Sequence, residues 1–258
     1  MHSNTNDNYP KSGQYIVFDL ELLHDLPLYE KYRRADSDPA NCRWPMKRVV
    51  AASVLALEVS GGQLTVTAFK SFAGKDEDRV LTSLFRFINE RPRAKLVTYG
   101  GVAMDVPVLR VAAMEHCLKL PVQLRMGDRS HHVHLDLAIA MKSGGRDFVH
   151  MLEIATRIGI PCKLAGSAGS VRYWVERNNY RSIEHLAESD AISTGLILAS
   201  YLDAQGELLS AKAAQLAIIR SVRPLRAHAP YARILGNVAD RLRREIHEEL
   251  NRWMARVA

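Results

Sequence analysis

The chain has 258 residues, of which 47% are hydrophobic and 24% are charged, and it carries a net charge of +7. A chain of this length and composition buries a sizeable core, which excludes a peptide scaffold and a disordered protein. The three cysteines lie far apart without CxxC spacing, so a disulfide framework and a cysteine-based zinc finger are excluded as well. We therefore expect one globular protein from a reducing compartment, with the cytoplasm as the default location.

The N-terminal segment is polar. Residues 1–14 lack an apolar signal-peptide core, and the longest nearly uncharged runs, 49–57 and 191–202, are shorter than the ~18 apolar residues of a membrane span. We expect a disordered tail over residues 1–14, no signal peptide and no membrane-spanning segment.

The first half of the chain has the pattern of strands followed by a crossover helix. The predicted elements are strands over Tyr15–Leu20, Arg48–Val59 and Gln63–Lys70, a helix over Asp76–Glu90, a strand over Ala94–Tyr99 and a helix over Val106–Leu118. Gly61 and Gly62 between the second and third strands are typical of a tight hairpin. A helix between the third and fourth strands predicts a mixed α/β core.

The second half is mostly helical. It contains a predicted strand over His132–Leu137, helices over Phe148–Ile158 and Ser182–Tyr201, and, after Gly206, helices over Leu208–Ile219 and Val238–Val257. We expect a main domain over residues 15–205 and a basic helical extension over residues 206–258.

Positive charge gathers in that extension. Residues 210–258 contain 10 Lys or Arg and 4 Asp or Glu, so they carry almost the whole net charge of +7. This favours a basic arm that binds a polyanion. The alternative is a solvated helix face, in which the apolar stripe of residues 238–257 packs on the body or on a second subunit and gives a homo-oligomer.

Asp19 and Glu21 interrupt the first strand. Period-2 alternation puts both carboxylates on one face of YIVFDLELL, where two like charges are costly unless a cation neutralises them. A hard divalent ion such as Mg²⁺ or Mn²⁺ is the simplest partner. Taken alone, the pattern fits solvated acids at an edge about as well.

Two further acids lie where helices are expected. Asp105 follows the fourth strand and the Gly100-Gly101 turn, where an ordinary N-terminal helix acid is the competing interpretation. Asp190 is in register with Leu186, Thr194 and Ile197, so it faces the side that its helix buries. A buried helical carboxylate needs a partner.

The order of these segments resembles a known superfamily. FDLE, TYGGVAMDVPVL, HVHLDLA, IGIPCK and HLAESD, over about Tyr15–Tyr201, resemble the DEDD exonucleases of the ribonuclease H-like fold, and most closely the predicted 3′-5′ exonucleases related to the exonuclease domain of type-B DNA polymerases. The resemblance implies an α/β fold with a mixed central sheet flanked by helices. It also implies cleavage at the 3′ end of single-stranded DNA or RNA.

The resemblance assigns roles to five residues. Asp19, Glu21, Asp105 and Asp190 would bind two Mg²⁺ or Mn²⁺ ions, and His185, in the H-x4-D spacing of the histidine subclass, would take the proton of the attacking water. The chain departs from the pattern in its second motif. The family usually has Asn-Gly-x-x-Phe-Asp there, whereas residues 100–105 read GGVAMD.

Two other interpretations compete with this one. The altered second motif and the basic tail suggest a nucleic-acid-binding module that has lost efficient cleavage. His132, His134 and Asp136 alternate on one strand and suggest a 2-His-1-carboxylate iron site, although three ligands so close in sequence rarely converge. Residues 163–170, KLAGSAGS, lack a nucleotide-binding motif and are expected to form a loop that contacts a phosphate backbone.

Overall fold

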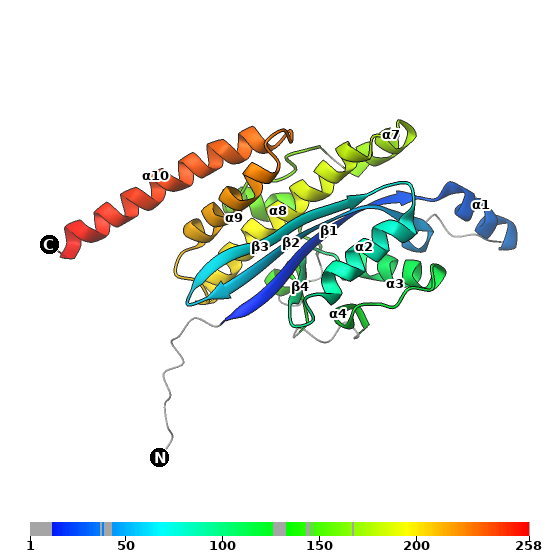
Figure 1. Cartoon of the computed structure of the whole chain (residues 1–258), viewed down its shortest axis with the longest axis horizontal. Coiled ribbons are helices and arrows are strands. Elements are labelled where there is room, and N and C mark those ends of the chain that lie inside the picture. Colours follow the sequence, from blue (N-terminus) through cyan, green and yellow to red (C-terminus); the bar gives the residue numbers. More distant parts are fainter. Residues whose placement is uncertain are drawn as a thin grey trace, which may run out of the picture.

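The computed structural model describes residues 12–36, 38, 43–125, 133–142, 145, 147–166 and 168–257. Their centre is a mixed sheet of strands in the order β3-β2-β1-β4-β5 (Figure 1). The strands are β1 (Gly13–His24), β2 (Lys47–Ser60), β3 (Gln63–Ala73), β4 (Lys95–Thr98) and β5 (His134–Asp136). β1 pairs antiparallel with β2 and parallel with β4, so the strand that carries Asp19 and Glu21 is central. This confirms the expected mixed sheet.

The helices account for most of the remaining described chain. They are α1 (Leu26–Ala35), α2 (Glu77–Asn89), α3 (Asp105–Glu115), α4 (Val122–Arg125), α5 (Leu137–Lys142), α6 (Met151–Arg157), α7 (Val171–Glu176), α8 (Tyr180–Ala204), α9 (Ala211–Leu225) and α10 (Ala232–Val257). All helices expected from the sequence are present. β1 begins two residues before Tyr15, within the segment expected to be a tail; residues 1–11 lie outside the described residues.

Helix α1 lies in a stretch to which the sequence pattern assigned no element. The Asp25 side chain caps it by accepting from the Leu28 amide at 2.9 Å, and Pro27 occupies its first turn. None of its residues is buried, so the helix presents no stripe to the core.

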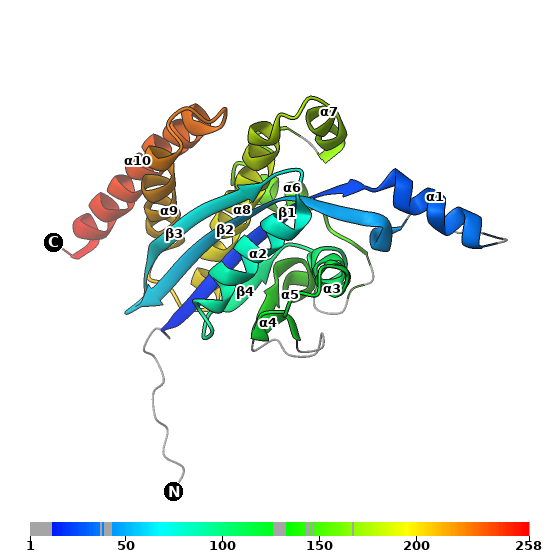
Figure 2. The same ribbon diagram turned by 45° about the vertical axis from the view of Figure 1, so that its right-hand side comes forward.

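The two faces of β1 pack against different helices (Figures 1 and 2). Ile16, Phe18 and Leu20 belong to a core with α2 and α3. Tyr15 and Val17 belong to a second core with α8, α9 and the start of α10. Asp19 and Glu21 follow Val17 in the period-2 alternation, so their side chains lie on the α8 face.

Helices α9 and α10 are part of this second core. Ile218, Ile219 and Val222 of α9 are fully buried in it, and α9 contacts both α8 and β3. The C-terminal end of α10 extends past α9 (Figures 1 and 2), and Leu250, Trp253 and Met254 are exposed there. The apolar stripe of the last helix therefore packs on the body over its first half.

A buried ion pair fixes the C-terminal helices to α8. Glu188 is fully buried and accepts from Arg226 Nε, Tyr231 Oη and Ser71 Oγ, each at 2.5 Å. Other basic groups of the expected arm also have partners in the chain, since Lys212 pairs with Glu245 and Glu249, and Arg243 pairs with Asp240. The pairs of Lys212 and Arg243 lie within residues 210–258, so they are already part of that segment's charge balance and do not lower its net positive charge.

Within the described residues, no helix has both the length and the apolarity required to cross a membrane.

A chain that ends at Leu209 should fail to fold, because it loses α9 and α10. Ile218, Ile219 and Val222 contribute about 1.5–3 kcal/mol each on burial, a large share of the about 5–15 kcal/mol of a typical domain. A chain that ends at His247 is the control, and its free energy of unfolding should change by less than about 1 kcal/mol. Solubility and urea unfolding measure both. A native-like transition of the shorter chain would contradict the shared core.

Candidate active site

The two acids of β1 lie beside an irregularity in the pairing of β1 with β2. Asp19 pairs with Ser53 and Glu21 with Ala51 on β2, and the register shifts between Glu21 and Leu22. Such bulges re-aim side chains and are common beside functional sites. Glu21 is buried and Asp19 is half-buried on the face that α8 covers.

Helix α8 supplies the third acid. It approaches the sheet so closely at Gly195 that an added Cβ would lie 2.7 Å from Leu55 Cδ2. Asp190 lies more than one turn before this contact, and its side chain is 13% exposed. The close approach of α8 to β2 therefore brings the acid of a distant segment to β1.

Three of the four predicted metal ligands converge. One carboxylate oxygen each from Asp19, Glu21 and Asp190 lies within 4.8 Å of the others. Hard divalent ions take oxygen ligands at about 2.0–2.6 Å, so three oxygens this close fit around such an ion. The chemistry of the donor set therefore fits Mg²⁺ or Mn²⁺.

Asp105 stands beside this group and is not part of it. It is half-buried at the first residue of α3, and its charge helps to raise the pKa of Asp19 and Glu21. The neighbouring turn is held by Asp136, whose carboxylate accepts from the Gly100 amide at 2.8 Å and the Val102 amide at 2.9 Å. Asp136 therefore fixes the loop that leads to Asp105.

Burial raises the pKa of every acid at the site, and acidic neighbours add to the rise for Asp19, Glu21 and Asp105. Burial, followed by the charge of Asp190, raises the pKa of Glu21 to about 8. Burial, followed by the charge of Asp136, raises the pKa of Asp105 to about 7. The pKa of Asp19 is raised by burial and by its acidic neighbours, and burial raises that of Asp190. Without a metal ion, some of these carboxyl groups therefore keep their protons at neutral pH.

Lys163 is a cation at the site, in the segment for which the sequence indicated a loop in contact with a phosphate backbone. Its Nζ forms an ion pair with Asp190, and its charge also lowers the pKa of Asp19 and Glu21. The Leu164 amide donates to Ser189 Oγ at 2.9 Å, which fastens this loop to α8. Lys163 has a φ of +55°, a left-handed conformation that is uncommon outside glycine and is often found at functional sites.

His185 lies on another side of α8. It is five positions before Asp190, which corresponds to about 140° around a helix. Its ring packs edge-on against Tyr231, with 6.0 Å between the ring centroids, and burial lowers its pKa. Its buried Nε2 has no hydrogen-bond partner among the described residues. The structure therefore does not bring His185 into the carboxylate group, and its role as a base stays a prediction.

The interpretation of residues 132–136 as an iron site finds no support in the described part. His134 Nε2 lies 2.9 Å from Thr98 Oγ1, and Asp136 accepts from backbone amides on both oxygens. His132 lies outside the described residues. Asp136 has a structural role that explains its burial.

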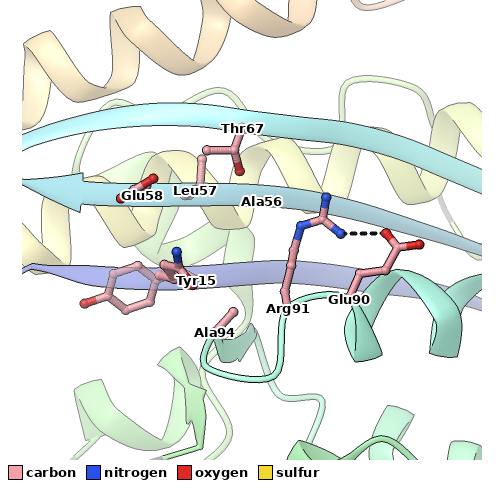
Figure 3. Close-up of a pocket in the computed structure, with 9 residues that line it drawn as sticks. Tyr15, Ala56, Leu57, Glu58, Thr67, Glu90, Arg91 and Ala94 are labelled. Carbon is pink, nitrogen blue, oxygen red and sulfur yellow. Dashed lines mark hydrogen bonds and ion pairs between the residues drawn. The ribbon is translucent and has the colours of Figure 1, made fainter.

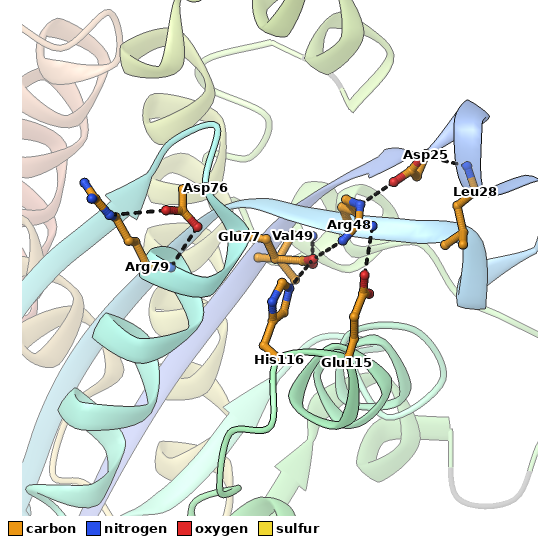
Figure 4. A network of polar contacts seen from close by, with 9 residues as sticks. All are labelled: Asp25, Leu28, Arg48, Val49, Asp76, Glu77, Arg79, Glu115 and His116. Carbon is orange, nitrogen blue, oxygen red and sulfur yellow. Dashed lines mark hydrogen bonds and ion pairs between the residues drawn. The ribbon is translucent and has the colours of Figure 1, made fainter.

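A second acidic group is already neutralised (Figure 4). Glu77, Glu115 and His116 have ligand atoms within 4.8 Å of one another. Arg48 donates to Glu77 and Glu115 at 2.9 Å each and also pairs with Asp25, while His116 Nε2 lies 3.0 Å from Glu77. This network ties β2 to α1, α2 and α3 and needs no metal ion.

A pocket of about 430 Å³ lies at the other end of the sheet (Figure 3). Its lining includes Tyr15, Ala56 and Thr67. It also includes the ion pair of Glu90 and Arg91, in which Arg91 Nη1 lies 3.3 Å from Glu90 Oε2. Tyr15 is four residues before Asp19 on β1, so the pocket is separate from the carboxylates.

The Glu21→Gln variant should be more stable than the metal-free wild type above neutral pH. The raised pKa of Glu21 means that the folded state retains a proton that the unfolded chain has lost, so the stability of the wild type falls as the pH rises from about 4.5 to about 8. The variant lacks the part of this fall that Glu21 contributes, so its stability should fall less over this range. Urea unfolding between pH 5 and pH 9 in EDTA measures it.

Glu58→Gln, an exposed acid of β2, is the control and should keep the pH dependence of the wild type. Identical pH profiles for wild type and Glu21→Gln would show that Glu21 is ionised without a metal.

One known protein family matches the chain. The model of the predicted 3′-5′ exonucleases related to the exonuclease domain of PolB matches residues 41–228. The family B DNA polymerase of the archaeon Pyrobaculum calidifontis is 16% identical with a TM-score of 0.47, and the match covers 81% of this chain and 29% of the polymerase. A structure of exonuclease I is 11% identical with a TM-score of 0.47, and the match covers 74% of this chain and 41% of that protein.

A structure of E. coli exonuclease I in complex with a 5cy-dA13 oligonucleotide is 12% identical with a TM-score of 0.45, and the match covers 74% of this chain and 40% of that protein. The chain thus spans less than half the length of these structures. Among the curated proteins, none matches the chain significantly. The family model covers well over half of the residues, and the chain therefore belongs to the family of predicted 3′-5′ exonucleases related to the exonuclease domain of PolB.

Proposed function

We propose that this protein is a metal-dependent 3′-5′ exonuclease that hydrolyses phosphodiester bonds at the 3′ end of single-stranded nucleic acid. The observation that carries the proposal is the convergence of Asp19, Glu21 and Asp190 within 4.8 Å, at the central strand of a fold that belongs to this family. Asp19, Glu21, Asp105 and Asp190 would hold two Mg²⁺ or Mn²⁺ ions. When bound, such ions activate a water and stabilise the charge on the scissile phosphate.

The protein contributes position and charge. The rigid β1 and α8 hold three carboxylates at fixed separations, and Asp136 orients the turn that leads to Asp105. Lys163 pairs with Asp190. With a metal ion held by that carboxylate, the ammonium of Lys163 would be available for a phosphate oxygen of the substrate.

A binding module without cleavage is the second candidate, and the pair between Lys163 and Asp190 favours it. An internal cation neutralises part of the charge that would otherwise attract metal ions. Such a module would bind oligonucleotides equally well in EDTA and would leave them intact.

With Mg²⁺ or Mn²⁺, the wild type should shorten a 5′-labelled single strand from its 3′ end, and EDTA should stop the reaction. Asp190→Asn should lower the turnover by about 10²- to 10⁴-fold, because one ligand of the metal site is lost. Asp203→Asn, on the same helix, is the control and should leave the turnover unchanged. Matched DNA and RNA strands identify the substrate. Binding without shortening in either metal would favour the binding module.

Lys163→Met should lower the turnover by about 10²-fold, because the phosphate of the substrate loses the ammonium group that would bind it. His185→Ala should lower the turnover by less than tenfold, because the His185 ring packs against Tyr231. Single-turnover rates between pH 5.5 and pH 9 measure both. A larger loss of turnover for His185→Ala than for Lys163→Met, of 10²- to 10⁴-fold and with a changed pH profile, would identify His185 as the general base.

A further inference from the structure

An aromatic ring is exposed beside the proposed active site. Phe148 is 58% exposed, although burial of such a side chain is usually favourable. Its ring contacts Gly100, where an added Cβ would lie 3.2 Å from Phe148 Cε2. Gly100 begins the turn whose amides bind Asp136 and which leads to Asp105.

The strand register places this ring near the carboxylates. Val17 of β1 pairs with Val97 of the parallel strand β4, and adjacent strands lie about 4.8 Å apart. Asp19 is two residues after Val17, and Gly100 is three residues after Val97. Gly100 therefore lies about one residue beyond the level of Asp19, at the same end of the sheet, and Phe148 covers it.

The structure holds the ring in place although most of it is open to solvent. The Tyr99 hydroxyl donates to the Val149 carbonyl at 3.0 Å, which fastens the neighbouring backbone to the end of β4. His150 packs edge-on against Phe148, with 5.2 Å between the ring centroids. Gly100 has a φ of +76° and no side chain, so the ring can lie directly on its backbone. A fixed, exposed ring loses little entropy when a flat ligand stacks on it.

We propose that Phe148 stacks on the base of one of the two 3′-terminal nucleotides of the substrate. The inference rests on the proposed exonuclease function and names a residue that binds the substrate. Aromatic side chains form sequence-tolerant platforms for single strands, because every base has a π-face. The GGVAMD segment that leads to Asp105 contains no aromatic residue, and Phe148 places an exposed ring on this turn.

Binding of single-stranded 12-mers to the Asp190→Asn protein with Mg²⁺ tests the proposal without cleavage. Phe148→Ala should raise the Kd by about 5- to 150-fold, the loss of one stacked base, and Phe148→Trp should retain the affinity. The effect of Phe148→Ala should vanish on a 12-mer with an abasic residue at one of the two 3′-terminal positions. Trp253→Ala removes a ring that is 61% exposed on α10, and it should bind like the parent protein.

An unchanged Kd for Phe148→Ala, or an equal loss on intact and abasic strands, would overturn the inference. Those results would leave the proposed function intact if the wild type still shortens the 12-mer in Mg²⁺. A wild type that neither binds nor shortens the strand would refute the proposed function itself. Near-ultraviolet circular dichroism of each variant checks that the fold is retained.

Discussion

Mutual repulsion of buried carboxylates is the constraint on which the site depends. Asp19 and Glu21 lie on the central strand, and α8 adds Asp190 to the same small volume. A sheet and a long helix, packed through Leu55 and Gly195, hold these groups together against their repulsion. Protons and Lys163 relieve that repulsion in the metal-free chain, as the raised pKa of Glu21 and the ion pair of Lys163 indicate. The fold thus maintains a site that favours cations.

The need to hold the carboxylates together also gives a role to the helices that pack on α8. The position of Asp190 depends on the depth at which α8 packs, and α8 is itself covered by α9 and the first half of α10. Glu188, two residues before Asp190, is fully buried and is neutralised by Arg226 and hydrogen-bonded to Tyr231, both in the connection between α9 and α10. Removing Arg226 would leave the buried charge of Glu188 without its cation. The C-terminal segment therefore supports the site from behind.

Sequence patterns predicted the elements that have strong periodicity. The alternation around Asp19 and Glu21 predicted both the strand and the shared face of its acids, and the register of Asp190 with Leu186 and Ile197 predicted its inward direction. The ion pair of Lys163 was not predicted, because it joins a loop to Asp190, which lies 27 residues further along the chain. Helix α1 was not predicted, because it has no buried residue. The surroundings of His185 depend on Tyr231, a tertiary contact that an H-x4-D spacing cannot reveal.

The central claim is that the carboxylates bind a divalent cation in exchange for protons, and calorimetric titration with Mn²⁺ tests it most directly. Titrations at pH 7 in two buffers of different ionisation enthalpy count the protons that each bound ion releases. The account predicts saturable binding with proton release by the wild type, fewer released protons for Glu21→Gln, and strongly weakened binding for Asp19→Asn. Binding that is unaffected by Asp19→Asn, or no binding at millimolar Mn²⁺, would contradict it.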